Sequence, residues 1–114
     1  MPDARLSLIE FPADDFQRAQ RFWEGMLGQP LEPRASAEGS GRQSRGEGTP
    51  VGLHERGSGP GDRFALPYFA VTDVAAALER VRALGGDVVH PGDAWAVCRD
   101  SEGTPFGLAR TTPA

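Results

Sequence analysis

The chain has 114 residues, which is enough for one compact domain. Its formal net charge of −4 and sequence pI near 5.1 argue against a nucleic-acid partner, because phosphates are bound by basic surfaces. The sequence has no run of the ~20 apolar residues that a membrane span needs, and its single cysteine, Cys98, excludes an intrachain disulfide. We therefore expect a cytoplasmic protein that binds neither nucleic acid nor a membrane.

The first quarter of the chain predicts a strand and then a helix. Residues 6–11 alternate in the manner of a half-buried strand, and Pro12 is expected to end it. Asp14-Asp15 offers an N-cap, and Gly28 is placed to end the helix that follows. The apolar residues between these two signals recur at helical spacing: Phe16, Ala19, Phe22, Trp23, Met26 and Leu27.

The middle of the chain is polar, with no apolar side chain between Ala37 and Val51. Such a segment cannot supply a core face, so it predicts a solvated hairpin or a mobile loop. Its side chains Arg42, Gln43 and Arg45 could also receive an anionic ligand at the rim of a pocket. A short strand is expected at residues 51–54 and a glycine-rich linker at 57–61.

The same order of elements returns in the second half. Residues 64–71 predict a strand, and Thr72 or Asp73 caps a helix that ends at Gly85-Gly86. Three further strands are expected, at residues 87–90, 94–99 and 106–110.

The two halves can be aligned as an internal repeat. Leu8 lies seven residues before Asp15, and Leu66 lies seven residues before Asp73. Each half closes on an apolar-Gly-Leu strand, at residues 51–53 and 106–108. A repeat of this length indicates two supersecondary modules rather than a solenoid.

Three segments resemble the vicinal oxygen chelate superfamily, which includes glyoxalase, bleomycin-resistance proteins and dioxygenases. They are residues 11–16 with the helix behind them, residues 68–74 with Leu84-Gly85-Gly86, and the closing turn and strand at residues 100–108. The resemblance implies an α+β fold of two βαβββ modules whose mixed sheet curls into a cup. Module one would cover about residues 4–56, a linker 57–63, and module two about 64–112. It also implies a homodimer.

The resemblance further implies where a metal would be bound. Enzymes of this superfamily hold a divalent metal with four side chains, one from the first and one from the last strand of each module. Those positions correspond here to Leu8, Gly52, Leu66 and Gly107, and none of these residues has a ligating atom. We therefore predict no metal, no cofactor and no catalytic residue.

A metal-free cup would offer a few candidate ligand-binding residues. Glu10 shares a strand face with Leu8, although a strand glutamate is more often solvated or paired with an arginine. Tyr68 and Trp95 combine flat apolar area with a hydrogen-bonding group, which suits an aromatic or amphiphilic ligand. The alternative is that they fill the cup as core. Arg99 is the fourth candidate.

The sequence leaves three functions open. The first is a metal-free small-molecule binding protein, similar to the drug-sequestering members of the superfamily. The second is a metal-dependent lyase, isomerase or dioxygenase with ligands outside the usual positions. The third is a non-catalytic dimeric interaction module. His54 and His90 are interpreted as surface residues, and Cys98 as a small core hydrophobe.

Overall fold

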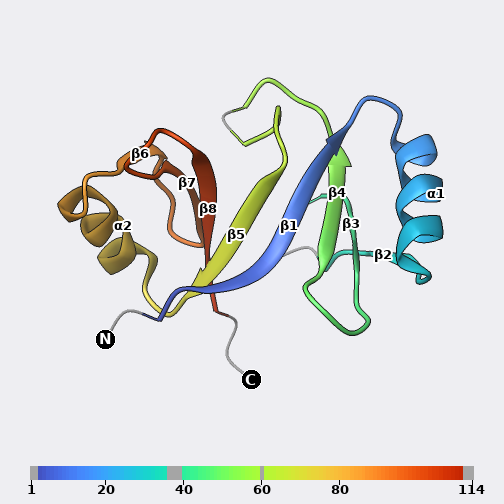
Figure 1. The fold of residues 1–114 in the computed structure, drawn as a ribbon, viewed down its shortest axis with the longest axis horizontal. Helices are drawn as coiled ribbons and strands as arrows, with labels where there is room; N and C mark the ends of the chain where they lie inside the picture. Colours follow the sequence, from blue (N-terminus) through green and yellow to red (C-terminus); the bar gives the residue numbers. More distant parts are fainter. Residues whose placement is uncertain (1–2, 36–39, 60, 112–114) are drawn as a thin grey trace. The chain divides into compact units, whose positions relative to one another are not determined.

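The computed structural model describes residues 3–35, 40–59 and 61–111. Within them the chain forms an α+β fold, as predicted, in which each of the two helices follows one strand and is followed by three. The elements are β1 (Arg5–Ala13), α1 (Phe16–Leu27), β2 (Leu31–Pro33), β3 (Arg42–Ser44), β4 (Val51–Glu55), β5 (Leu66–Val71), α2 (Val74–Ala83), β6 (Asp87–His90), β7 (Trp95–Arg99) and β8 (Pro105–Arg110) (Figure 1).

The chain divides into two compact units, which we describe separately. Residues 8–65 form the first unit, here called module one; residues 1–7 and 66–114 form the second, here called module two. The strand order is β2-β3-β4-β1 in module one and β5-β8-β7-β6 in module two. In each unit the first and last strands are parallel and the remaining pairs are antiparallel. The predicted βαβββ repeat is therefore confirmed.

The helix of module one begins and ends at the predicted residues. The Asp15 carboxylate accepts the Arg18 N–H at 3.0 Å, and Gly28 adopts a left-handed φ of 69° while its N–H donates to the Glu24 carbonyl. One face of α1 packs on the sheet, where Trp23 stacks on Phe11 with ring centroids 4.5 Å apart. The buried members of this core are Ala13, Leu31 and Leu53.

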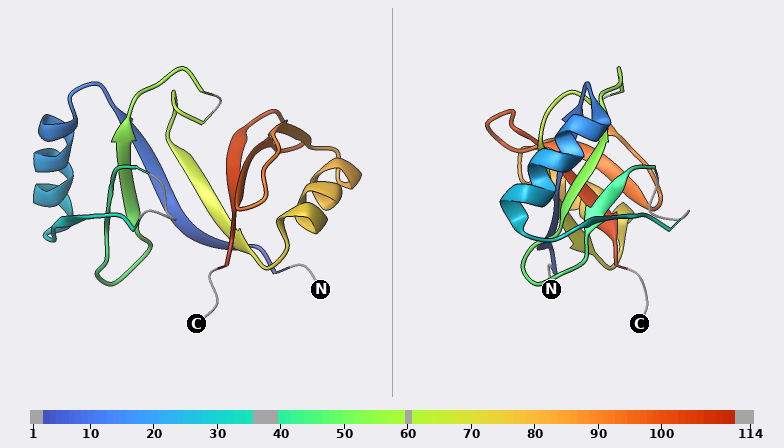
Figure 2. Two further views of the ribbon diagram at one scale, coloured as in Figure 1. Left: turned by 180° about the vertical axis from the view of Figure 1, so that it is seen from behind. Right: turned by 90° about the vertical axis from the view of Figure 1, so that its right-hand side faces the viewer.

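Module two uses the same local devices. The Asp73 carboxylate accepts the Ala76 N–H at 3.0 Å, so Asp73 rather than Thr72 is the N-cap, and Gly85 takes a φ of 93° beyond the helix end. Figure 2 shows α2 on one side of the strands β7 and β8. The core between them consists of Val71, Val74, Leu78, Ala96, Cys98 and Leu108.

The predicted end of the first strand is wrong. Pro12 does not end the first strand, because pairing with β4 continues past it and the Arg56 N–H donates to the Ala13 carbonyl at 2.8 Å. The polar middle segment contains a strand, β3, which pairs antiparallel with β2 on one side and β4 on the other, so the hairpin alternative is confirmed and the mobile loop is not. Ser44 at its end is buried, and its hydroxyl accepts the Val51 N–H at 2.9 Å. Residues 36–39 of the predicted loop lie outside the described residues.

In the part of the chain that the structure describes, neither helix is long and apolar enough to cross a membrane.

Candidate functional site

A buried ion pair lies on the face of the module one sheet that α1 does not cover. The Arg34 Nη2 donates to both carboxylate oxygens of Glu10 at 2.6 Å, and the two side chains are only 6% and 8% exposed. Glu10 projects from β1, and Arg34 directly follows β2. Because Phe11 and Ala13 pack toward α1, the alternation of the strand places Glu10 on the opposite face.

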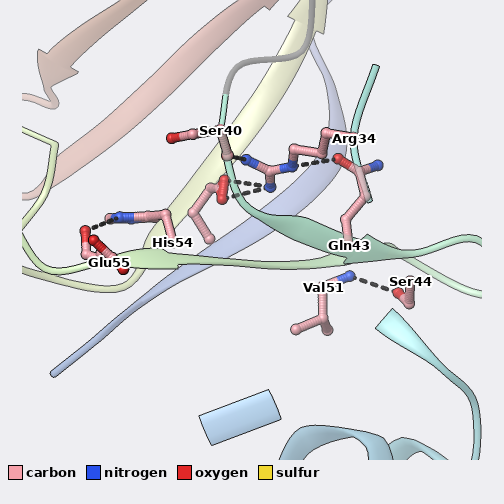
Figure 3. Close-up of polar contacts among 8 residues, drawn as sticks. Arg34, Ser40, Gln43, Ser44, Val51, His54 and Glu55 are labelled. Atoms are coloured by element: carbon pink, nitrogen blue, oxygen red, sulfur yellow. Dashed lines mark hydrogen bonds and ion pairs between the residues drawn. The ribbon is translucent and has the colours of Figure 1, made fainter. Parts of the chain in front are cut away.

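The remaining donors of Arg34 are held by its own module. Its Nε donates to the Gln43 Oε1 at 3.0 Å, and its Nη1 donates to the Ser40 carbonyl at 3.0 Å. Figure 3 shows the Arg34 guanidinium between Ser40 and Gln43. It also shows the hydrogen bond that the Val51 N–H donates to the Ser44 hydroxyl. Among the described residues, no buried side-chain nitrogen or oxygen lacks a hydrogen-bond partner. The pair is thus a closed, charge-neutral network.

The room for this network comes from a glycine. Gly52 on β4 lies directly across from Glu10 in the parallel register. A Cβ built on Gly52 would overlap the Arg34 guanidinium and approach the Glu10 carboxylate oxygen to 2.6 Å. Any side chain at residue 52 would therefore displace the ion pair.

Module two repeats this arrangement with a different side chain. Gly107 on β8 lies across from Tyr68 on β5, again in a parallel register. A Cβ on Gly107 would overlap the ring of Tyr68, so the phenol lies against the glycine. Glu10 and Tyr68 thus occupy equivalent positions, each filling the space left by a glycine in the closing strand.

The four positions that correspond to metal ligands do not fit a divalent metal. Leu8 and Leu66 offer only hydrocarbon, and the spaces beside Gly52 and Gly107 are filled by a guanidinium and a phenol ring. A guanidinium also repels a metal cation. Among the described residues, no group of three or more His, Cys, Asp or Glu side chains is placed to hold a metal ion.

The face of module two opposite α2 carries the other predicted ligand-binding residues. Ala96 and Cys98 pack toward α2, so Trp95, Val97 and Arg99 point the other way. Trp95 is 48% exposed and stacks on His90, with ring centroids 4.8 Å apart and planes at 23°. Arg99 is exposed, whereas Val97 is 1% exposed. The two exposed residues of this face, Trp95 and Arg99, therefore lie at opposite ends of β7 with the buried Val97 between them.

The structure brings Tyr68, Trp95 and Arg99 to one face of module two, and it holds Glu10 in module one with Arg34 as its partner. Arg34 is the residue that the sequence analysis missed. The glycine across from Glu10 could have indicated it. A residue without a side chain there leaves space beside the carboxylate, and a buried carboxylate requires a cation. His54 contacts the adjacent Glu55 carbonyl at 2.9 Å, and Cys98 is buried in the core.

A chain of two βαβββ modules, in each of which the first and last strands pair in parallel, has the architecture of the glyoxalase/bleomycin-resistance/dioxygenase superfamily. The model of a glyoxalase-like domain family matches residues 8–109. The chain therefore belongs to the glyoxalase-like domain family and, with it, to the vicinal oxygen chelate superfamily.

Solved structures agree with this fold. A hypothetical protein from Bacillus halodurans is 14% identical, with a TM-score of 0.73 over 98% of this chain and 97% of its own. Methylmalonyl-CoA epimerase from Mycobacterium tuberculosis is 17% identical, with a TM-score of 0.67 over 95% of this chain and 88% of its own. A glyoxalase/bleomycin resistance protein/dioxygenase superfamily member from Vibrio splendidus is 16% identical, with a TM-score of 0.63 over 96% of this chain and its full length. A comparison with curated protein sequences finds no match.

Proposed function

We propose that this chain binds a small aromatic or amphiphilic molecule without a divalent metal. The observation that carries the proposal is the filling of both closing-strand glycines. At Gly52 a guanidinium takes the space of a ligand side chain, and at Gly107 a phenol ring does so. A site built in this way lacks a Lewis acid, so binding rests on shape and aromatic surface.

The binding surface in this proposal is the face of module two that carries Trp95 and Arg99. An indole supplies apolar area at little cost in conformational entropy, and its stacking on His90 holds the ring in place. The exposed guanidinium of Arg99 suits an anionic group on the ligand. Tyr68 contributes to the same face from β5.

We also propose that the protein acts as a homodimer in the cytoplasm. Phe22 and Met26 lie one turn apart on α1 and are 58% and 68% exposed, which favours a partner surface over solvent. Cys98 is a free thiol, as a reducing compartment allows. Light scattering during size-exclusion chromatography tests the dimer, and a monomer at all concentrations would reject it.

Metal content is the first test of the main proposal. Protein purified without a chelator is expected to contain no stoichiometric Mn, Fe, Ni or Zn, and none of these ions should raise its melting temperature. Stoichiometric metal would reject the proposal and favour a metal-dependent lyase, isomerase or dioxygenase with other ligands.

The second test uses 1-anilinonaphthalene-8-sulfonate as an amphiphilic aromatic probe. Trp95→Ala is expected to weaken its binding about tenfold or more, the size of effect seen when an aromatic anchor is truncated. Trp23→Phe is the matched control, because Trp23 packs between α1 and β1 in module one and should leave binding unchanged. Equal affinities for all three proteins would remove the Trp95 face as the site.

A further inference from the structure

A cavity lies on the side of the module two sheet opposite the Trp95 face, beside α2. Its volume is about 260 Å³. Its walls are one face of α2, the end of β5, part of β8 and the segment that precedes β1, and the remaining side is open. The lining residues that carry its chemistry are Asp3, Asp73, Arg80, Val81, Phe106 and Leu108. All of them belong to module two, so the cavity is complete within one unit.

The internal repeat explains why this space is open. In module one, Trp23 lies eight residues after the helix cap Asp15 and fills the space between helix and sheet by stacking on Phe11. In module two, the residue eight positions after the cap Asp73 is Val81, which lines the cavity. An isopropyl group thus stands where the other module has an indole. The vacancy has the chemistry of a site for a planar aromatic ring.

Charge is distributed unevenly around the cavity. At one end, Asp73 and Asp3 accept the backbone N–H groups of Ala76 and Thr72 at 3.0 and 3.2 Å, so both carboxylates are committed to the start of α2. Hydrogen bonding to the side chain of Thr72, and less strongly to its backbone N–H, lowers the pKa of Asp3. Arg80 lies two helical turns further on, about 10 Å along the axis. Within the described ranges, its guanidinium makes no ion pair.

From these observations we propose that the cavity binds a planar aromatic carboxylate. The ring occupies the space that Trp23 fills in module one, against Val81, Phe106 and Leu108. The carboxylate points away from Asp3 and Asp73 and pairs with Arg80. This site is distinct from the Trp95 face, because Trp95 and the α2 cavity lie on opposite sides of the sheet.

Indole-3-acetate is the probe that tests this proposal on the full chain. Titration followed by ¹H–¹⁵N NMR is expected to shift the backbone amides of Ala76, Ala77 and Val81, with a Kd of roughly millimolar as for a fragment of this size. Trp95→Ala is expected to leave these shifts and this Kd unchanged. Shifts confined to the β7 face, or none at several millimolar probe, would overturn the proposal while leaving the Trp95 proposal intact.

Two substitutions probe the ring and the charge separately. Val81→Trp supplies the indole from the chain itself and is expected to weaken indole-3-acetate binding at least about tenfold, as loss of a hot-spot contact does. Arg80 is exposed, so Arg80→Gln is expected to keep the fold. It is expected to weaken indole-3-acetate about fivefold and to leave the neutral indole-3-acetamide unchanged. Equal affinity of Arg80→Gln and the parent protein for indole-3-acetate would reject the charged half of the site, and with it the proposal.

Discussion

The two modules share one backbone plan and differ in what fills the space beside their closing-strand glycines. In module one the occupant is Glu10, a buried carboxylate that brings Arg34 with it. In module two it is Tyr68, which fills the space with a ring. A glycine in the closing strand therefore leaves room for different side chains on the parallel neighbouring strand. Where that side chain is charged and buried, it requires a counter-ion from elsewhere in the module.

The two modules also differ in the side chains that fill the space between helix and sheet. Module one fills its helix–sheet space with the stacked pair Trp23 and Phe11. Module two has Val81 and an edge-to-face pair, Phe69 and Phe106, whose centroids are 6.1 Å apart. Both helix sides therefore carry aromatic rings, but module one has an indole at the helix position where module two has only the smaller Val81. Substitutions that exchange or remove these occupants test this comparison directly.

The largest expected effect is at the buried ion pair. Glu10→Gln leaves the Arg34 guanidinium buried without a counter-charge, and we expect a loss of about 3–5 kcal/mol in the free energy of unfolding. Urea denaturation followed by circular dichroism measures it. The matched control is Asp14→Asn at the exposed pair of Asp14 and Arg56, whose side chains are 71% and 41% exposed. That change should cost less than about 1 kcal/mol.

A double replacement separates the charge from the packing. Glu10→Leu with Arg34→Met removes both charges, and it is expected to recover most of the stability lost in Glu10→Gln. If Glu10→Gln lowers the free energy of unfolding no more than Asp14→Asn does, the buried pair stabilises the fold no more than the exposed pair. The two modules would then differ in residue type at this position but not in stability.

The next largest effect is expected at the glycines. Gly107→Ala drives a methyl group into the Tyr68 ring and should cost about 1–3 kcal/mol, and the cost should shrink when Tyr68→Ala is also present. Gly25→Ala is the control, because a Cβ there meets nothing within 4 Å and a helix interior favours alanine. Its free energy of unfolding should rise by about 0.5–1 kcal/mol. A Gly107→Ala protein as stable as the parent would show that the ring does not depend on the glycine.

The sequence predicted those features that rest on neighbouring residues. The caps Asp15 and Asp73 and the stop at Gly28 are local, because a carboxylate or a missing Cβ acts within one turn. The strand β3, by contrast, has the sequence Arg-Gln-Ser and owes its pairing to its neighbours β2 and β4. No hydrophobic alternation marks such a strand.

The candidate site was predictable only in part, for the same reason. The positions of Leu8, Gly52, Leu66 and Gly107 follow from the repeat, so the loss of the four metal-ligand positions was visible. The partner of Glu10 was not, since Arg34 lies 24 residues away and no spacing rule joins them. The α2 cavity depends on which side chains fill a three-dimensional gap, and Val81 alone reads as an ordinary core residue.

The smallest expected effect concerns the core of module two at alkaline pH. Burial raises the pKa of the Cys98 thiol above its ordinary value of 9.0, because the charged thiolate would be desolvated. A raised pKa in the folded protein means that this contribution to stability is full below pH 9 and is lost as pH rises above it. Between pH 8 and pH 10 the loss should approach about 1 kcal/mol. Urea denaturation at both pH values measures it, with Cys98→Ala as the control that lacks the ionisable group. A difference between the two proteins that stays constant from pH 8 to pH 10 would mean that the thiol ionises as readily folded as unfolded. The core around Cys98 would then be open to water.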